Sequence, residues 1–509
     1  MNLTTEQRQT GRQNFYNTLG VTRRDFLKAS AAVPIAGAFY FGYAELGGSP
    51  VRAGLIGTGS QGGVLLTHSN PDYLRFTDFS EIRPSQVERI KVGGQEDPDR
   101  IGFLQKYKLN EEQFVQDIRY HEDYRQLLAN PDIELVVIAL PLRDHYQVVV
   151  DALDAGKHVL CESLLAREVG QCKELVRKAK QAGLHLAVGY QRNYSVLYDN
   201  ARSIIADGLL GDVHHVRAYW HRNNTWPQMH GRNPIMEDGE IQLVNEWKMP
   251  ISGFDSGVDF KKYGYRSLEE LCWWRLYQRT SEGLLAELGS HQLDACSALL
   301  GGVQPLSVCG IGTRYSSSGD DQIDDQIFAT FEFPGKTHPH GSGAGKDLQD
   351  IVVASYSAIT SNSQDQYGEQ ISGTRGTLFV EAEEDAMLFK ETEPGQPTSP
   401  SATSVTVVTN DAGSPALDTA ESSDASGASA GWAQGATQKQ AGYGFREQTE
   451  HLAWCIRNPA PENQPRCGAD VALATAICAL TTKRAIREGT RIEFQPEWFD
   501  PASDEVPPV

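Results

Sequence analysis

A glycine-rich turn directly after an apolar run constrains the fold of this chain more than any other feature. The run covers residues 51–56, and the turn is Gly57-Thr58-Gly59-Ser60-Gln61-Gly62. Between a strand and a helix, this spacing is typical of a dinucleotide site. The first glycine makes the turn, the second admits a pyrophosphate, and the third lets the helix pack closely. Apolar residues at 64–66 continue the predicted helix, whose N-terminal end would face the phosphates.

An acidic residue about 20 positions after the first strand is expected to bind the ribose hydroxyls of a dinucleotide. The second predicted strand, residues 73–82, offers Asp78 and Glu81. Glu81 is favoured because it lies at the end of the strand, next to Arg83 and a proline. A carboxylate there accepts bonds from an unmodified ribose and repels a 2′-phosphate, which favours NAD. Arg83 is close enough to hold such a phosphate, so NADP stays open.

Strands and helices alternate through the first part of the chain. Apolar runs predict strands over 51–56, 73–82, 133–140, 158–161 and 184–190. Helical stretches separate them, including one predicted over 120–128. This alternation predicts an α/β fold whose N-terminal Rossmann domain, residues 51–191, contains a doubly wound parallel sheet.

The remaining chain, residues 192–509, has a different pattern. Strand-like runs follow one another over 213–220, 303–313, 326–333, 351–359 and 376–381. Strands without helices between them predict an α+β domain with an open, mostly antiparallel sheet. One face of that sheet would be free for substrate or for a second subunit, and we expect a homo-oligomer. Residues 392–440 are rich in Ser, Thr, Ala, Gly and Asp, which indicates a low-complexity insert.

The composition limits the partners of this chain. Its formal net charge is −20 over 509 residues, and it has no basic stripe with interleaved aromatic residues. Such a surface repels nucleic-acid backbones and anionic membranes, so we expect no nucleic-acid partner. The eight cysteines show no C-x-x-C spacing. The sequence therefore signals neither a disulfide framework nor a metal site.

Residues 1–50 contain an export signal. The segment Thr22-Arg23-Arg24-Asp25-Phe26-Leu27-Lys28 matches the twin-arginine pattern, and an apolar stretch of small residues follows over 29–44. Such signals direct proteins out of the cytoplasm. The apolar stretch is shorter than the ~20 residues that a spanning helix needs. The cleavage site at Gly42-Tyr43-Ala44 is imperfect, so we expect a periplasmic or exported protein that keeps a membrane tether if the signal stays uncleaved.

Candidate ligand-binding residues lie at or just after the ends of several predicted strands, at the edge where ligands bind to such sheets. They are Pro141 and His145 after the third strand, Glu162 after the fourth, and Tyr190 at the end of the fifth. In the second part, His291 and Asp294 are three residues apart, which places them on one helix face. The pair can serve as a base and the carboxylate that orients it; a structural histidine is the alternative. The aromatic cluster over 220–226 suits sugar stacking and core packing equally.

Together these stretches resemble the Gfo/Idh/MocA oxidoreductases, the relatives of glucose–fructose oxidoreductase and inositol dehydrogenase, including their exported twin-arginine subset. The similarity rests on 57–62, 139–145, 155–162 and 289–294. It implies that the nicotinamide ring lies near Pro141 and Glu162. It also implies that His291 is the catalytic acid/base and that Asp294 lies on the substrate side. The implied activity is NAD(P)-dependent hydride transfer at a hydroxyl of a sugar, polyol or glycoside.

One position departs from the family pattern. After Glu162 the family usually has Lys-Pro, whereas this chain has Ser163-Leu164. Serine keeps a hydroxyl but lacks the charge, and losing one such electrostatic group commonly costs orders of magnitude in rate. His291 ranks first as a substitute because it needs no unusual pKa. The other candidates are Tyr190, Tyr277 and Lys157. A NAD-dependent glycosidase and a non-catalytic dinucleotide- or sugar-binding protein stay open as alternatives.

Overall fold

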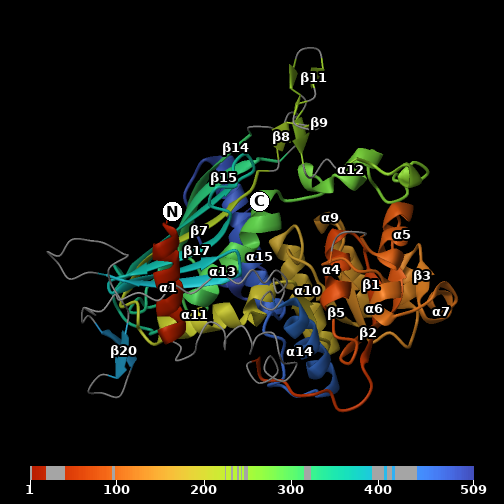
Figure 1. The fold of residues 1–509 in the computed structure, drawn as a ribbon. Helices are drawn as coiled ribbons and strands as arrows, with labels where there is room; N and C mark the ends of the chain where they lie inside the picture. Colours follow the sequence, from red (N-terminus) through yellow and green to blue (C-terminus); the bar gives the residue numbers. More distant parts are fainter. Residues whose placement is uncertain are drawn as a thin grey trace.

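The first lobe is built on a parallel sheet of six strands (Figure 1). The computed structural model describes residues 3–18, 41–94, 98–223, 250–314, 323–391 and 444–508, with short strands inside 225–245 and 406–418. The strand order is β3-β2-β1-β4-β5-β6. The strands are β1 (Val51–Ile56), β2 (Leu74–Ser80), β3 (Arg119–His121), β4 (Leu135–Ile138), β5 (His158–Cys161) and β6 (Leu186–Val188). The predicted parallel sheet is confirmed.

Helices cover both faces of this sheet, and its central strands are accordingly apolar along their whole length. Every residue of β4 is buried. The covering helices include α4 (Ser60–His68), α5 (Pro84–Val92), α9 (Leu142–Asp154) and α10 (Val169–Ala182). The last of these ends at Gly183, which has a left-handed φ of 65° that suits glycine. The connections from strand to helix therefore all lie at the carboxyl edge of the sheet.

The helix predicted over 120–128 is wrong in its first half. Residues 119–121 form the edge strand β3, and the helix α8 covers only Tyr124–Leu128. The Asp123 side chain accepts a bond from the backbone N–H of Arg125, so the helix starts there. An exposed strand of three residues carries no apolar run, which is why the pattern missed it.

The second lobe contains an eight-stranded sheet in the order β19-β18-β17-β7-β16-β15-β14-β22. Its strands are β7 (Val213–His221), β14 (Ser307–Thr313), β15 (Gln326–Pro334), β16 (Ile351–Ile359), β17 (Tyr367–Gly373), β18 (Gly376–Glu381), β19 (Asp385–Lys390) and β22 (Ile492–Glu493). Strand β7 runs parallel to β16 and antiparallel to β17. The sheet is thus mostly antiparallel, as predicted.

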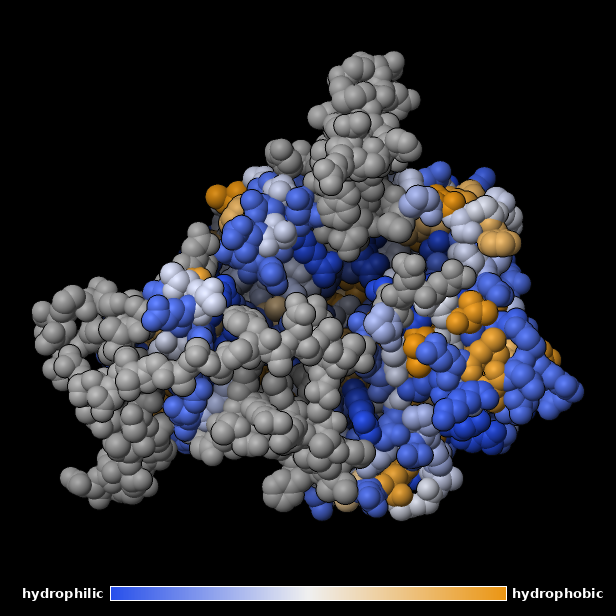
Figure 2. Space-filling model, viewed as in Figure 1, coloured by the Kyte–Doolittle hydropathy of each residue, from blue (hydrophilic) through white to orange (hydrophobic). Residues whose placement is uncertain are grey.

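Helices pack on one face of this second sheet. They are α13 (Ser290–Leu299), the π-helical turn just before it (Leu285–Gly289) and α15 (Ala469–Glu488). On the opposite face, Ile311, Phe328 and Val353 are exposed. That apolar surface matches the expected free face, and oligomerisation stays a prediction. In the view of Figure 2, surface side chains are mainly hydrophilic, with small hydrophobic patches on the first lobe.

Helix α1 (Thr5–Thr18) lies within the predicted leader and packs against β19. It buries Phe15 and Tyr16, and its Arg12 bonds to the Asp385 carboxylate at 2.7 Å. No sequence pattern indicated this packing. The twin-arginine segment 22–28 lies outside the described residues, as does most of the insert 392–440.

Candidate active site

Two of the three glycines in the turn leave no space for a side chain. Gly57 has φ +87°, and a Cβ added there would lie 2.4 Å from the carbonyl oxygen of Ala139. A Cβ on Gly62 would lie 2.3 Å from the carbonyl oxygen of Gly57. A Cβ on Gly59 would meet nothing within 4 Å. The backbone of the turn therefore packs closely on the loop after β4, whereas the space beside Gly59 is open. Helix α4 begins at the next residue, Ser60, so a pyrophosphate has room to approach its N-terminus.

Glu81 lies at the end of β2, beside this turn. One carboxylate oxygen, Oε2, accepts bonds from the backbone N–H and the hydroxyl of Thr58, at 2.9 and 3.1 Å. The competing acid Asp78 is already committed to His121 Nε2, at 2.8 Å, and to Asn130. Glu81 also accepts from the backbone N–H groups of Ile82 and Arg83, but its place after the carboxyl end of β2 keeps it the acid nearer the glycine turn, and its ribose contact stays a prediction. Arg83 turns to Asp255 of the second lobe instead.

Pro141 and His145 lie at the start of α9, after β4. Pro141 is the N-cap residue of that helix. His145 is buried, and its two ring nitrogens contact the carbonyl oxygens of Leu164 and Leu140, at 2.7 and 2.9 Å. Burial lowers the pKa of His145. Its ring therefore ties the loop after β4 to the loop after β5, which makes it a positioning residue.

Glu162 lies between the glycine turn and Gly189, the residue after β6. The amide of Gln61 donates to Glu162 Oε1 at 2.9 Å. A Cβ on Gly189 would lie 2.4 Å from Glu162 Oε2, so only glycine leaves space for this carboxylate. Burial raises the pKa of Glu162 to about 7. A group with that pKa can exchange protons near neutral pH.

His291 meets the loop after β5. Its Nε2 lies 3.3 Å from the hydroxyl oxygen of Ser163, the residue that replaces the family lysine. Burial, with added repulsion from Arg192 and Arg222, lowers the pKa of His291 to about 3. The expectation that His291 has an ordinary pKa is therefore wrong: the imidazole is neutral throughout the physiological range.

Four buried polar atoms around His291 have no hydrogen-bond partner within the described part of the chain. They are His291 Nδ1, Tyr190 Oη, Trp220 Nε1 and Tyr356 Oη. The rings of Tyr190 and Trp220 lie 5.5 and 6.0 Å from the imidazole, centre to centre. The Tyr356 hydroxyl lies against Gly289, two residues before His291. Because buried polar groups normally find partners, this cluster points to a hydroxyl-bearing ligand.

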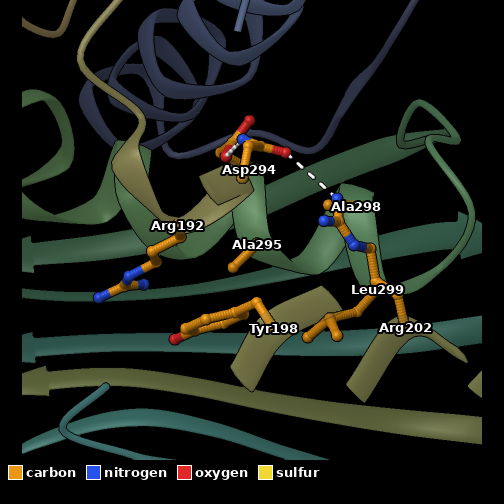
Figure 3. Close-up of a pocket in the computed structure, with 8 residues that line it drawn as sticks. Arg192, Tyr198, Arg202, Asp294, Ala295, Ala298 and Leu299 are labelled. Atoms are coloured by element: carbon orange, nitrogen blue, oxygen red, sulfur yellow. Dashed lines mark hydrogen bonds between the residues drawn. The ribbon is translucent and has the colours of Figure 1, made fainter. Parts of the chain in front are cut away.

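The predicted pairing of His291 with Asp294 is not formed. Both residues are on α13, but the Asp294 carboxylate accepts from Asn193 Nδ2 at 2.6 Å and from the Thr475 hydroxyl at 3.5 Å. Burial raises the pKa of Asp294 to about 7. Asp294 lines a cavity of about 10 Å³ together with Arg192. Figure 3 shows the side chains that surround it. That space fits one water and no sugar.

Arg275 and Glu287 also belong to the site. Arg275 Nε bonds to Glu287 Oε2 at 3.0 Å, and this partly exposed pair lies close enough to Glu162 to influence its pKa. Glu287 is four residues before His291, a spacing that could have indicated a shared helix face. The candidate Lys157 lies away from the site, because its amino group bonds to the carbonyls of Asn130 and Ile133 before β4.

Comparison with protein families decides the relationship. A model described as "Oxidoreductase family, NAD-binding Rossmann fold" matches residues 51–190, and the "GFO/IDH/MocA C-terminal domain" matches residues 261–379. The chain belongs to the GFO/IDH/MocA family. Its first lobe is accordingly an NAD-binding Rossmann domain of an oxidoreductase family.

Individual relatives of this GFO/IDH/MocA protein are distant. Trans-1,2-dihydrobenzene-1,2-diol dehydrogenase of Bos taurus is 24% identical over 50% of the chain and 56% of the relative. Inositol 2-dehydrogenase/D-chiro-inositol 3-dehydrogenase of Lactiplantibacillus plantarum is 37% identical over 18% of the chain and 26% of the relative. The chain thus spans about half or less of these relatives. Levoglucosan dehydrogenase in complex with NADH has a TM-score of 0.55 at 15% identity, covering 88% of this chain and 100% of that one, which shows a shared fold.

Proposed function

We propose that this protein transfers hydride between a nicotinamide cofactor and a hydroxyl carbon of a sugar, polyol or glycoside. The observation that carries the proposal is the contact of His291 Nε2 with Ser163 Oγ, at 3.3 Å. Ser163 follows Glu162, which bonds to Gln61 of the glycine turn. An imidazole from the second lobe thus meets the loop after β5, which supports a position beside the nicotinamide where a substrate hydroxyl would lose its proton.

The residues of the crevice fit a dinucleotide. The open side of Gly59 and the N-terminus of α4 would hold the pyrophosphate, and Glu81 would hold the adenosine ribose. When bound, the nicotinamide supplies a carbon that accepts or returns hydride. The carboxylate of Glu81 at the ribose position favours NAD over NADP.

His291 would take the hydroxyl proton of the substrate. Because the imidazole is neutral, one ring nitrogen carries a proton and the other is an acceptor. If Nε2 donates to Ser163, the unpaired Nδ1 is the acceptor that faces the substrate; the opposite tautomer makes Nδ1 a donor. The hydroxyls of Tyr190 and Tyr356 and the indole N–H of Trp220 would then bond to further substrate hydroxyls. A hydroxylated ring fits this set better than an apolar substrate does.

Serine at position 163 favours a second candidate, a NAD-dependent glycosidase on the same scaffold. Without a lysine, the site has a weaker proton donor beside the oxidised carbon. A cycle that oxidises a ring carbon, eliminates the aglycone, adds water across the resulting double bond and then reduces the ketone returns the cofactor to its starting state. A purely dinucleotide- or sugar-binding role is the third reading of the same substitution.

We also propose that the twin-arginine segment 22–28 exports the protein. A protein that leaves folded can acquire its dinucleotide in the cytoplasm. Among the described residues no helix is long and apolar enough to cross a bilayer. Replacing Arg23 and Arg24 by lysines and following the protein in periplasmic fractions tests export; unchanged fractionation would contradict it.

The purified full-length protein tests the catalytic proposal. Denaturation should release a dinucleotide, and a panel of sugars and polyols should change the nicotinamide absorbance. A parallel panel of chromogenic glycosides detects the second candidate as aglycone release without net NADH. His291→Gln is the matched control, because it keeps a hydrogen-bonding side chain and loses the acid/base. Wild-type protein that binds no dinucleotide and changes no substrate overturns the proposal.

A further inference from the structure

A strap from the second lobe, residues 252–282, crosses the carboxyl edge of the Rossmann sheet. It bonds to residues that follow four successive strands. After β2 it contacts Arg83, after β3 Glu122, after β4 Arg143 and after β5 Arg167. Figure 1 shows α12 (Leu268–Cys272), which belongs to the strap, above the end of this lobe near α5. The strap therefore lies along the edge where the dinucleotide is expected.

Asp255 joins the strap to the first lobe and has no exposed surface. Its Oδ2 accepts from Arg83 Nε and Nη2, at 3.0 and 2.8 Å, and from the hydroxyl of Ser85 at 2.7 Å. Its Oδ1 accepts from the backbone N–H of Ser85 at 2.9 Å. Burial alone would raise the pKa of Asp255, but these bonds outweigh it and lower the pKa. Asp255 also lies outside both stretches that match the family models.

Arg83, two residues after Glu81, is a feature that favours a 2′-phosphate. Its backbone N–H donates to Glu81 Oε1 at 2.9 Å, so the arginine starts beside the ribose position. An arginine in that position of a Rossmann domain accommodates the phosphate of NADP. Here its guanidinium makes two bonds to a buried carboxylate, and charge-assisted pairs of this kind are among the strongest in proteins.

We propose that Asp255 is a specificity-determining residue that makes the protein select NAD, because it holds Arg83 away from a 2′-phosphate. The proposal rests on the dinucleotide site described under Proposed function. Selectivity then has two parts. Glu81 repels the phosphate, and Asp255 removes the cation that would compensate. Because Asp255 belongs to the other lobe, cofactor choice depends on how the strap packs against the Rossmann domain.

Asp255→Asn tests this directly. The amide oxygen still accepts from Ser85, while the amide N–H₂ faces Arg83 and no longer binds it. Isothermal titration of wild type and variant with NAD⁺ and NADP⁺ measures both affinities without turnover. The freed guanidinium should tighten NADP⁺ binding roughly tenfold, the effect of one charge-assisted bond, and leave NAD⁺ nearly unchanged. The double variant D255N/R83A should lose that gain.

Two further variants keep the test decisive. Glu282→Gln weakens the strap contact to Arg167, which follows β5 on the other side of β1 from β2, so it should leave the NADP⁺/NAD⁺ ratio unchanged. The double variant D255L/R83L removes the ion pair without leaving a buried charge, so it should also leave the ratio unchanged, and it serves if Asp255→Asn does not fold. An unchanged ratio in Asp255→Asn, an equal change in Glu282→Gln, or weaker NADP⁺ binding in D255L/R83L overturns the proposal. Wild type that binds neither nucleotide overturns the proposed function instead.

Discussion

Gly59→Ala separates the two roles that a glycine in the turn can have, shaping the backbone and admitting the cofactor. A Cβ at position 59 meets nothing within 4 Å, and its φ of −61° suits any residue. We therefore expect the free energy of unfolding to fall by less than ~1 kcal/mol. In Gly62→Ala, by contrast, the new Cβ would lie 2.3 Å from a backbone carbonyl oxygen, which cannot move as a side chain would. Overpacking of this kind costs about 1–3 kcal/mol.

The affinity for NAD should distinguish Gly59→Ala from Gly62→Ala further. In Gly59→Ala the methyl group takes the space that the pyrophosphate needs. Losing one or two charge-assisted bonds, at about 1.5–3 kcal/mol each, would weaken NAD binding roughly 10- to 100-fold or more. Thermal unfolding and calorimetric titration of both variants measure the two effects separately. A Gly59→Ala protein that binds NAD as tightly as wild type would refute the reasoning that this turn receives the pyrophosphate.

Three further outcomes are expected. His291→Gln should lower kcat by about 10²-fold or less, the low end for a general acid/base, because a pKa of about 3 makes the imidazole a weak base at neutral pH, and NAD affinity should stay intact; an equal loss of NAD affinity would contradict the assignment. Ser163→Ala should lower kcat about tenfold by removing the bond that orients His291, with a thermal midpoint close to wild type. Asp294 has a folded pKa of about 7 against about 3.9 unfolded, so it makes stability fall as pH rises through this window. Asp294→Asn should flatten that slope in thermal melts between pH 4 and 7, and an unchanged slope would count against a buried, protonated Asp294.

The sequence predicted those parts of the site whose positions follow from the order of the strands. Because the strands are parallel, Glu81, Pro141 and Glu162 had to reach one edge of the sheet once their strands were recognised. The spacing of the three glycines predicted the turn because a strand-to-helix turn of this kind needs glycine at those positions. No pattern of residues along the chain could indicate that Ser163 would meet His291, which lies 128 positions away.

The errors have physical reasons of the same kind. Helical spacing correctly placed Asp294 and His291 on one helix, yet Asn193 and Thr475, from distant segments, decide where the carboxylate points. The pKa of His291 depends on burial and on two arginines that only the folded chain brings near. Short, exposed β3 has no apolar run to reveal it. The sequence predicted which residues could carry chemistry, but it could not predict the electrostatic environment that sets their pKa values.

That environment bears on how the protein can work without the family lysine. An ammonium group would supply both a hydrogen bond and a positive charge beside a developing alkoxide. Ser163 supplies a hydrogen bond to His291. The charge of the lysine is replaced only in part. Burial, the largest cause of the lowered pKa of His291, disfavours charge of either sign, so it supplies no positive potential. Arg192 and Arg222 add a smaller repulsion, and Arg192 is itself paired with Glu369 and Glu383. We infer that serine keeps the hydrogen-bonding function of the lysine but not its charge, which predicts a slower reaction than a lysine at position 163 would give.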